Sequence, residues 1–236
     1  MLREFFVEKR VWRLIMTCFL LIGMFPVGSE SAKLVAGLKE SKDFTVVIDA
    51  GHGGEDPGKV GVHQEKEKEI NLQIAKFVQM ELENAGIRVV MTRETDEDLA
   101  DENASNKKRQ SLQRRCELAT RENADCVVSI HQNSYTDASA KGAQVFYYTT
   151  SEEGKHLAEL LQKFLVEGVD PENHRLAKGN DSYYLLKKMK SPTVIVECGF
   201  LSNPEESILL SSEEYQRKIA SAISKGIINY LLPMRS

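Results

Sequence analysis

The chain is poor in cysteine, in net positive charge and in long apolar runs, and each shortage excludes a class of protein. Four cysteines among 236 residues are too few for a disulfide scaffold. No Cys-x-x-Cys pair is present, which argues against a cysteine-based structural zinc site. A net charge of −4 excludes a strongly basic nucleic-acid binder, because contacts with phosphates need clustered Lys and Arg.

Several common catalytic signatures are also missing from the sequence. There is no G-x-x-x-x-G-K-[ST] phosphate loop and no G-x-G-x-x-G that opens directly into a helix. The H-E-x-x-H helix of many metalloproteases and the G-x-S-x-G turn of serine hydrolases are absent as well. If the chain is an enzyme, its chemistry must come from residues that lie far apart in the sequence.

The N-terminus is typical of an exported protein. An uncharged apolar run at residues 14–27 follows a segment with four basic side chains, at Arg3, Lys9, Arg10 and Arg13. The run is shorter than the roughly 20 residues of a comfortable membrane-spanning helix. We therefore predict a signal peptide or N-terminal membrane anchor at 1–29, a linker at 30–43 and one folded domain at 44–233.

Strand and helix patterns alternate through that domain. The expected strands cover residues 45–49, 87–91, 126–130, 142–148 and 193–196, and the expected helices cover 67–85, 110–123, 155–167 and 211–230. This alternation predicts an α/β fold with three layers, in which helices flank a twisted, mostly parallel sheet.

Polar side chains stand at the ends of three expected strands: His52, His131 and Glu197. Ligands of open α/β sheets bind outside the carboxyl ends of the strands, so these groups are expected to converge. Two imidazoles and a carboxylate suit a catalytic Zn²⁺, which takes three protein ligands. The carboxylate could be Glu197 or a glutamate at 65–69. The acids at 65–69 could also simply complement the dipole of the helix that they open.

Five stretches carry a family resemblance. They cover residues 46–58, 67–72, 89–96, 127–134 and 194–206. Together they resemble the zinc-dependent N-acetylmuramoyl-L-alanine amidases of the Amidase_3 type, in particular the small amidases of sporulation and germination. The resemblance implies that His52, Glu67 and His131 hold one zinc ion and that Glu197 performs acid–base catalysis.

The sequence departs from the family pattern at three places. Asp-Ala-Gly-His (49–52) replaces the commoner Asp-Pro-Gly-His, and the segment before Glu67 is one residue longer than in close relatives. Cys198 stands where the family usually has an apolar residue. Beside Glu197 it could act as a nucleophile, but a small apolar role at a buried strand end is the commoner one.

The resemblance implies hydrolysis of the amide bond between N-acetylmuramic acid and L-alanine in a peptidoglycan substrate. It also implies a role in spore-cortex maturation, through muramic-δ-lactam formation, and in germination. Action would take place at the outer face of the cytoplasmic membrane, in the forespore intermembrane space or in the cell wall, and an accessory sporulation protein is a possible partner. Candidate substrate contacts are Asn133, Arg93 and Arg115, although a solvated or structural salt bridge is the commoner role for each arginine. Tyr183 could line a sugar groove or simply pack. The alternatives are a non-catalytic, membrane-tethered wall-binding or regulatory protein, and a zinc peptidase on a related fold.

Overall fold

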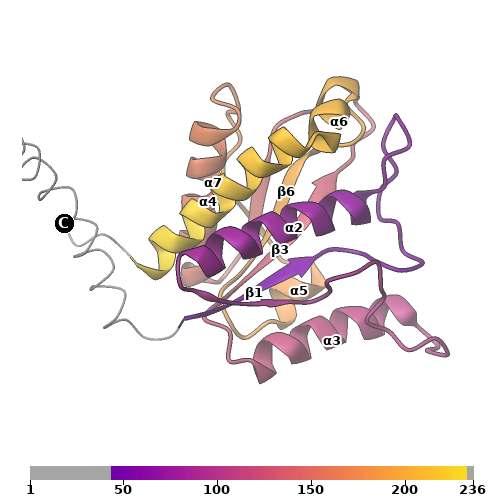
Figure 1. Cartoon of the computed structure of the whole chain (residues 1–236), viewed down its shortest axis with the longest axis vertical. Coiled ribbons are helices and arrows are strands. Elements are labelled where there is room, and N and C mark those ends of the chain that lie inside the picture. Colours follow the sequence, from indigo (N-terminus) through magenta and orange to yellow (C-terminus); the bar gives the residue numbers. More distant parts are fainter. Residues whose placement is uncertain (1–43, 233–236) are drawn as a thin grey trace, which may run out of the picture. The chain divides into compact units, whose positions relative to one another are not determined.

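Six strands form one sheet in the computed structural model, which describes residues 44–232 (Figure 1). The strands are β1 (Thr45–Ala50), β2 (Arg88–Met91), β3 (Cys126–Asn133), β4 (Gln144–Tyr148), β5 (Lys178–Asn180) and β6 (Thr193–Phe200). Their order across the sheet is β2-β1-β3-β6-β4-β5. Every pairing is parallel except that of β4 with β6. The predicted signal or anchor and its linker lie outside the described residues.

Helices cover both faces of the sheet. The helices α2 (Glu67–Asn84), α4 (Glu152–Gly168) and α7 (Glu213–Leu231) pack together on one face, and α3 (Lys107–Arg121) and α5 (Tyr184–Lys188) contact each other on the opposite face (Figure 1). A short helix, α6 (Pro204–Ser211), follows β6. The three-layer α/β architecture predicted from the sequence is thereby confirmed. In residues 44–232 we find no helix with the length and apolar character needed to span a membrane.

The strand sequences explain the two-sided packing. Alternate residues of a strand point to opposite faces of the sheet. Val46 and Ile48 of β1 therefore join the main core under α2, α4 and α7, whereas Val47 joins a smaller cluster with Ala119 of α3. All six residues of β1 are buried, as expected of a parallel strand covered on both sides.

Three elements were not predicted: β5, α5 and α6. Two strands are longer than predicted: β3 continues to Asn133 and β6 to Phe200. The last helix begins two residues later than expected, since the Ser212 hydroxyl caps it by accepting a hydrogen bond from the Tyr215 backbone.

The topology creates a crevice at one edge of the sheet. β1 pairs with β2 on one side and with β3 on the other, so the chain changes direction across the sheet at β1. Loops that leave the carboxyl ends of such strands diverge and leave space for a ligand. The loop after β1, the first turn of α2 and the ends of β3 and β6 all lie at this point.

Candidate active site

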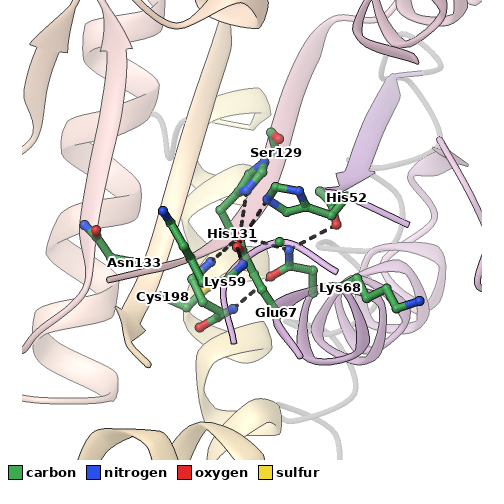
Figure 2. Close-up of polar contacts among 12 residues, drawn as sticks. His52, Lys59, Glu67, Lys68, Ser129, His131, Asn133 and Cys198 are labelled. Atoms are coloured by element: carbon green, nitrogen blue, oxygen red, sulfur yellow. Dashed lines mark hydrogen bonds and ion pairs between the residues drawn. The ribbon is translucent and has the colours of Figure 1, made fainter. Parts of the chain in front are cut away.

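Three side chains from separate elements meet at the crevice. His52 lies in the loop after β1, Glu67 is the first residue of α2, and His131 lies in β3. His52 Nε2 is 3.2 Å from Glu67 Oε2, and His131 Nδ1 is 2.9 Å from Glu67 Oε1. Each residue offers one donor atom, and these three atoms lie within 4.8 Å of one another. Figure 2 shows the two imidazoles and the carboxylate turned toward one another.

Two glycines make this approach possible. A Cβ on Gly51 would lie 2.3 Å from Cε1 of His131, so any larger residue would displace the ring. Gly58 has a φ of +69°, and a Cβ there would lie 2.5 Å from Glu67 Oε2. Only glycine adopts this backbone conformation without a steric penalty. The motif around His52 therefore needs glycine both for its turn and for the space beside the donor atoms.

The Glu67 carboxylate is buried and held by backbone donors. Lys59 N donates to Oε2 at 2.7 Å, and Gln132 N donates to Oε1 at 3.1 Å. Burial alone would raise the pKa of Glu67, but hydrogen bonds and charge from His131 and His52 outweigh it and hold the pKa far below its usual range. Glu67 therefore presents an anion to the two imidazoles. Two His and one carboxylate are a standard ligand set of catalytic zinc, so the donor chemistry fits that ion.

Glu197 lies directly beside His131. The two residues are register partners in the parallel pair β3–β6, and neighbouring strands are about 4.8 Å apart. Glu197 is only 8% exposed, and its Oε2 is buried without a hydrogen-bond partner among residues 44–232. Burial raises the pKa of Glu197, which favours a carboxyl group that can both take up and release a proton.

A cavity of about 850 Å³ opens over these groups. All four residues line it, together with Asn133 and Tyr183. The Tyr183 hydroxyl opposes the rise in the pKa of Glu197 that burial causes, and the Tyr183 ring packs edge-on against Phe146 at 5.7 Å between centroids. The sequence left two roles open for Tyr183: packing, or lining a sugar-binding groove. The structure places it in the wall of the cavity, next to the buried carboxyl.

Arg93 and Arg115 have the structural contacts that were the alternative to a substrate contact. Both were candidates for orienting an anionic substrate, yet they are 2% and 3% exposed. Arg93 donates to backbone carbonyls, at Ala50, Gly51, Lys68 and Thr95. Arg115 binds the buried Asp49 carboxylate and the backbone carbonyls of Ala50 and His52. Their donors are used to support the loop of His52, so these arginines hold the site from beneath.

The two remaining candidates, Asn133 and Cys198, lie in different surroundings. Asn133 lines the cavity but is set apart from the donor cluster in Figure 2. Cys198 is fully buried in β6, and burial raises the pKa of its thiol well above the usual value, which disfavours the thiolate that a nucleophile needs.

One residue of the site was not anticipated from the sequence. Asp56 Oδ2 lies 2.8 Å from His52 Nδ1, and its position four residues after a candidate ligand is the signal that could have identified it.

Comparisons with known proteins identify the family of the chain. A family model described as N-acetylmuramoyl-L-alanine amidase (Amidase_3) matches residues 46–229. The germination-specific N-acetylmuramoyl-L-alanine amidase of Bacillus subtilis is 38% identical over 188 residues, which cover 78% of each chain. AmiA of Escherichia coli, an N-acetylmuramoyl-L-alanine amidase, is 32% identical over 78% of this chain and 75% of its own.

The solved structures show the same similarity. The CwlD amidase from Clostridioides difficile, determined in complex with the GerS lipoprotein, superposes with a TM-score of 0.77 at 41% identity, and the match covers 80% of this chain and 98% of CwlD. AmiC2 of Nostoc punctiforme superposes with a TM-score of 0.71 at 36% identity, over 81% and 98% of the two chains. Family model, relatives and fold thus agree. The chain belongs to the Amidase_3 family of N-acetylmuramoyl-L-alanine amidases and is an enzyme that acts on peptidoglycan.

Proposed function

We propose that the enzyme is a zinc-dependent amidase that cleaves the bond between the lactyl group of N-acetylmuramic acid and the first L-alanine of the stem peptide. His52, Glu67 and His131 would hold one Zn²⁺. The observation that supports this most directly is the convergence of their donor atoms within 4.8 Å, with the buried Glu197 as the strand neighbour of His131.

The chemistry follows from the positions of the residues. A bound zinc ion supplies a Lewis acid that polarises the scissile carbonyl and lowers the pKa of water. Glu197 Oε2, which has no hydrogen-bond partner among residues 44–232, accepts the proton of the attacking water and then delivers it to the departing alanine nitrogen. Tyr183 orients the Glu197 carboxyl through its hydroxyl. Asn133 supplies a polar contact for the substrate in the wall of the same cavity.

Mass analysis of digested peptidoglycan tests the cleavage point. The purified enzyme should release free stem peptides that begin with L-alanine and leave glycan chains with intact lactyl groups. Glu197→Gln should bind zinc as wild type does but lose at least about 10²-fold in kcat, since general acid–base catalysis contributes about 10²- to 10⁴-fold. Full activity of Glu197→Gln would contradict the role of Glu197. Cleavage between other residues of the stem peptide would contradict the proposed bond.

We further propose that the enzyme prepares spore-cortex peptidoglycan for muramic-δ-lactam formation and thereby serves germination. This rests on similarity to a Bacillus subtilis amidase named as germination-specific and to the CwlD amidase. A strain that lacks the gene should form spores whose cortex has no δ-lactam, and complementation with Glu197→Gln should not restore it. Unchanged lactam in the deletion strain would overturn this role.

Export and a partner belong to the same proposal. Residues 1–29 would act as a signal peptide or membrane anchor, residues 30–43 as a linker and residues 44–233 as the catalytic domain that works outside the cytoplasmic membrane. CwlD was determined with a lipoprotein, and we propose that an exported accessory protein binds this amidase too. Cell fractionation with and without residues 1–29 tests export. Co-purification of the tagged amidase from sporulating cells, followed by reconstitution with each recovered protein, tests the partner.

A further inference from the structure

Asp56 has contacts that join the candidate ligand His52 to its own loop. Its Oδ2 lies 2.8 Å from His52 Nδ1, and its Oδ1 accepts a hydrogen bond from Gly58 N at 3.1 Å. Its backbone forms a short bridge with Gly53, with two N–H···O distances of 3.1 Å. One carboxylate therefore spans the turn and touches the imidazole at the same time.

Arg115 holds the backbone carbonyl of His52 at 2.9 Å, which fixes the main chain but leaves the rotation of the ring free. His52 has a φ of +63°, a left-handed conformation that is uncommon for a residue with a side chain. His131, in contrast, lies inside β3 and is held by the strands on either side. The rotation of the His52 ring must therefore be set by a side-chain contact, and Asp56 provides one.

The hydrogen bond also determines which nitrogen carries the proton. A carboxylate only accepts hydrogen bonds, so Nδ1 next to Asp56 must be the protonated nitrogen. With Nδ1 protonated, Nε2 is the nitrogen whose lone pair a bound metal ion would take, and Nε2 is the one that faces Glu67 Oε2 at 3.2 Å. Ligating histidines commonly donate their second N–H to a carboxylate, and this fixes both tautomer and ring orientation.

We propose that Asp56 is the positioning residue of the metal centre: its carboxylate locks His52 in the tautomer and the ring orientation that present Nε2 to the ion. The proposal rests on the zinc site described above. Asp56 contacts His52 at Nδ1 and supplies no donor atom to the cluster itself, and its side chain is 45% exposed, so substitution there is compatible with folding.

Asp56→Asn is the most informative change. Asparagine keeps the shape and can still accept from Gly58 N, but it presents an N–H to His52 Nδ1. The imidazole must then accept at Nδ1 and carry its proton on Nε2, where a ligand needs a lone pair. We expect the zinc dissociation constant, measured by competition with a chelator, to rise about 10- to 100-fold. Asp56→Ala removes the acceptor and should give an intermediate loss of affinity.

Glu55→Gln is the matched control. Glu55 is the sequence neighbour, its side chain is 82% exposed, and it pairs with Lys107 at 2.7 Å without touching His52. The same loss of charge at that position should leave zinc affinity within about twofold of wild type. An equal loss of zinc affinity in both variants would show an effect of net charge and would overturn the proposal.

The tautomer is read directly from ¹⁵N chemical shifts of the His52 ring in the metal-free protein. Wild type should carry a proton on Nδ1, whereas Asp56→Asn should carry its ring proton on Nε2 alone. Wild-type zinc affinity together with an Nδ1–H imidazole in Asp56→Asn would refute the role of Asp56. If the wild-type enzyme bound no zinc, the proposed function would fail, whereas the ring spectra would still decide whether Asp56 controls His52.

Discussion

At the scale of the residue, a second buried carboxylate supports the site from below. Asp49, the penultimate residue of β1, accepts hydrogen bonds from Thr92 Oγ1 at 2.8 Å and Ser129 Oγ at 2.5 Å and pairs with Arg115. Burial alone would raise the pKa of Asp49, but Arg115 and the two hydroxyls outweigh it and hold the pKa below its ordinary value. Arg115 in turn holds the carbonyl of His52 at 2.9 Å.

Asp49→Asn should therefore be strongly destabilising, by about 3 kcal/mol, because it leaves the buried Arg115 without its counter-ion. The folded-state pKa of Asp49 lies below the ordinary 3.8. Its stabilisation is therefore present above about pH 4 and is lost as the pH falls toward the folded-state value. Urea unfolding measured between pH 3 and pH 7 should show the difference between wild type and variant shrinking at the acid end. A constant difference across this range would contradict the assignment.

Gly58→Ala should damage the site more than the fold. The added Cβ would meet Glu67 Oε2 at 2.5 Å in a backbone with φ +69°, so the carboxylate must move. We expect zinc affinity to fall at least tenfold. Gly86→Ala is the control, because Gly86 has φ +79° but nothing within 4 Å of a Cβ. It should cost about 1 kcal/mol of stability and leave zinc affinity unchanged. Equal effects of the two substitutions on zinc affinity would argue against this account.

The sequence allowed some of these residues to be anticipated and hid others. His52, His131 and Glu197 stand at recognisable strand ends, and the family motif pointed to Glu67. For Arg93 the sequence left a substrate contact and a structural role open, because its hydrogen bonds go to backbone carbonyls that are brought together only by folding. A basic residue in a loop has the same appearance in the sequence whether it contacts a substrate or a carbonyl.

At the scale of the element, the hydrophobic pattern located the long helices and the buried strands but not their direction. β4 has the apolar residues of a strand, yet nothing in its sequence shows that it runs antiparallel to β6. The three-residue β5 and five-residue α5 are too short to establish a period. α6 did carry a readable signal, since Asn203 caps it and Pro204 occupies its first turn, a typical helix start.

The packing of α4 against α7 depends on one small residue. A Cβ on Gly226 of α7 would lie 2.9 Å from Leu161 Cδ1 and 3.0 Å from its Cα. Gly226→Val should lower the free energy of unfolding by about 1–3 kcal/mol through overpacking, as measured by denaturant titration. Lys225→Val, at the exposed neighbouring position, controls for the helix propensity of valine and should be nearly neutral. Equal losses in the two variants would count against a packing constraint.

At the scale of the whole molecule, zinc should stabilise the fold by mass action. A ligand that binds only the native state adds about 2.7 kcal/mol at one hundred times its dissociation constant. For a domain of this size, each kcal/mol raises Tm by about 2–4 °C. Saturating zinc should thus raise Tm by about 5–10 °C in wild type and have little effect on His131→Ala. An equal shift in both proteins would place the binding elsewhere on the chain.

The position of β6 has a consequence for how activity first arises. β6 is the last strand in the sequence, but it fills the middle of the sheet between β3 and β4, and it brings Glu197 with it. A nascent chain that has emerged only as far as β4 lacks the strand that joins the two halves of its sheet. It also lacks Glu197, which lies on that strand. The site is therefore complete only once the final strand has been inserted into the sheet.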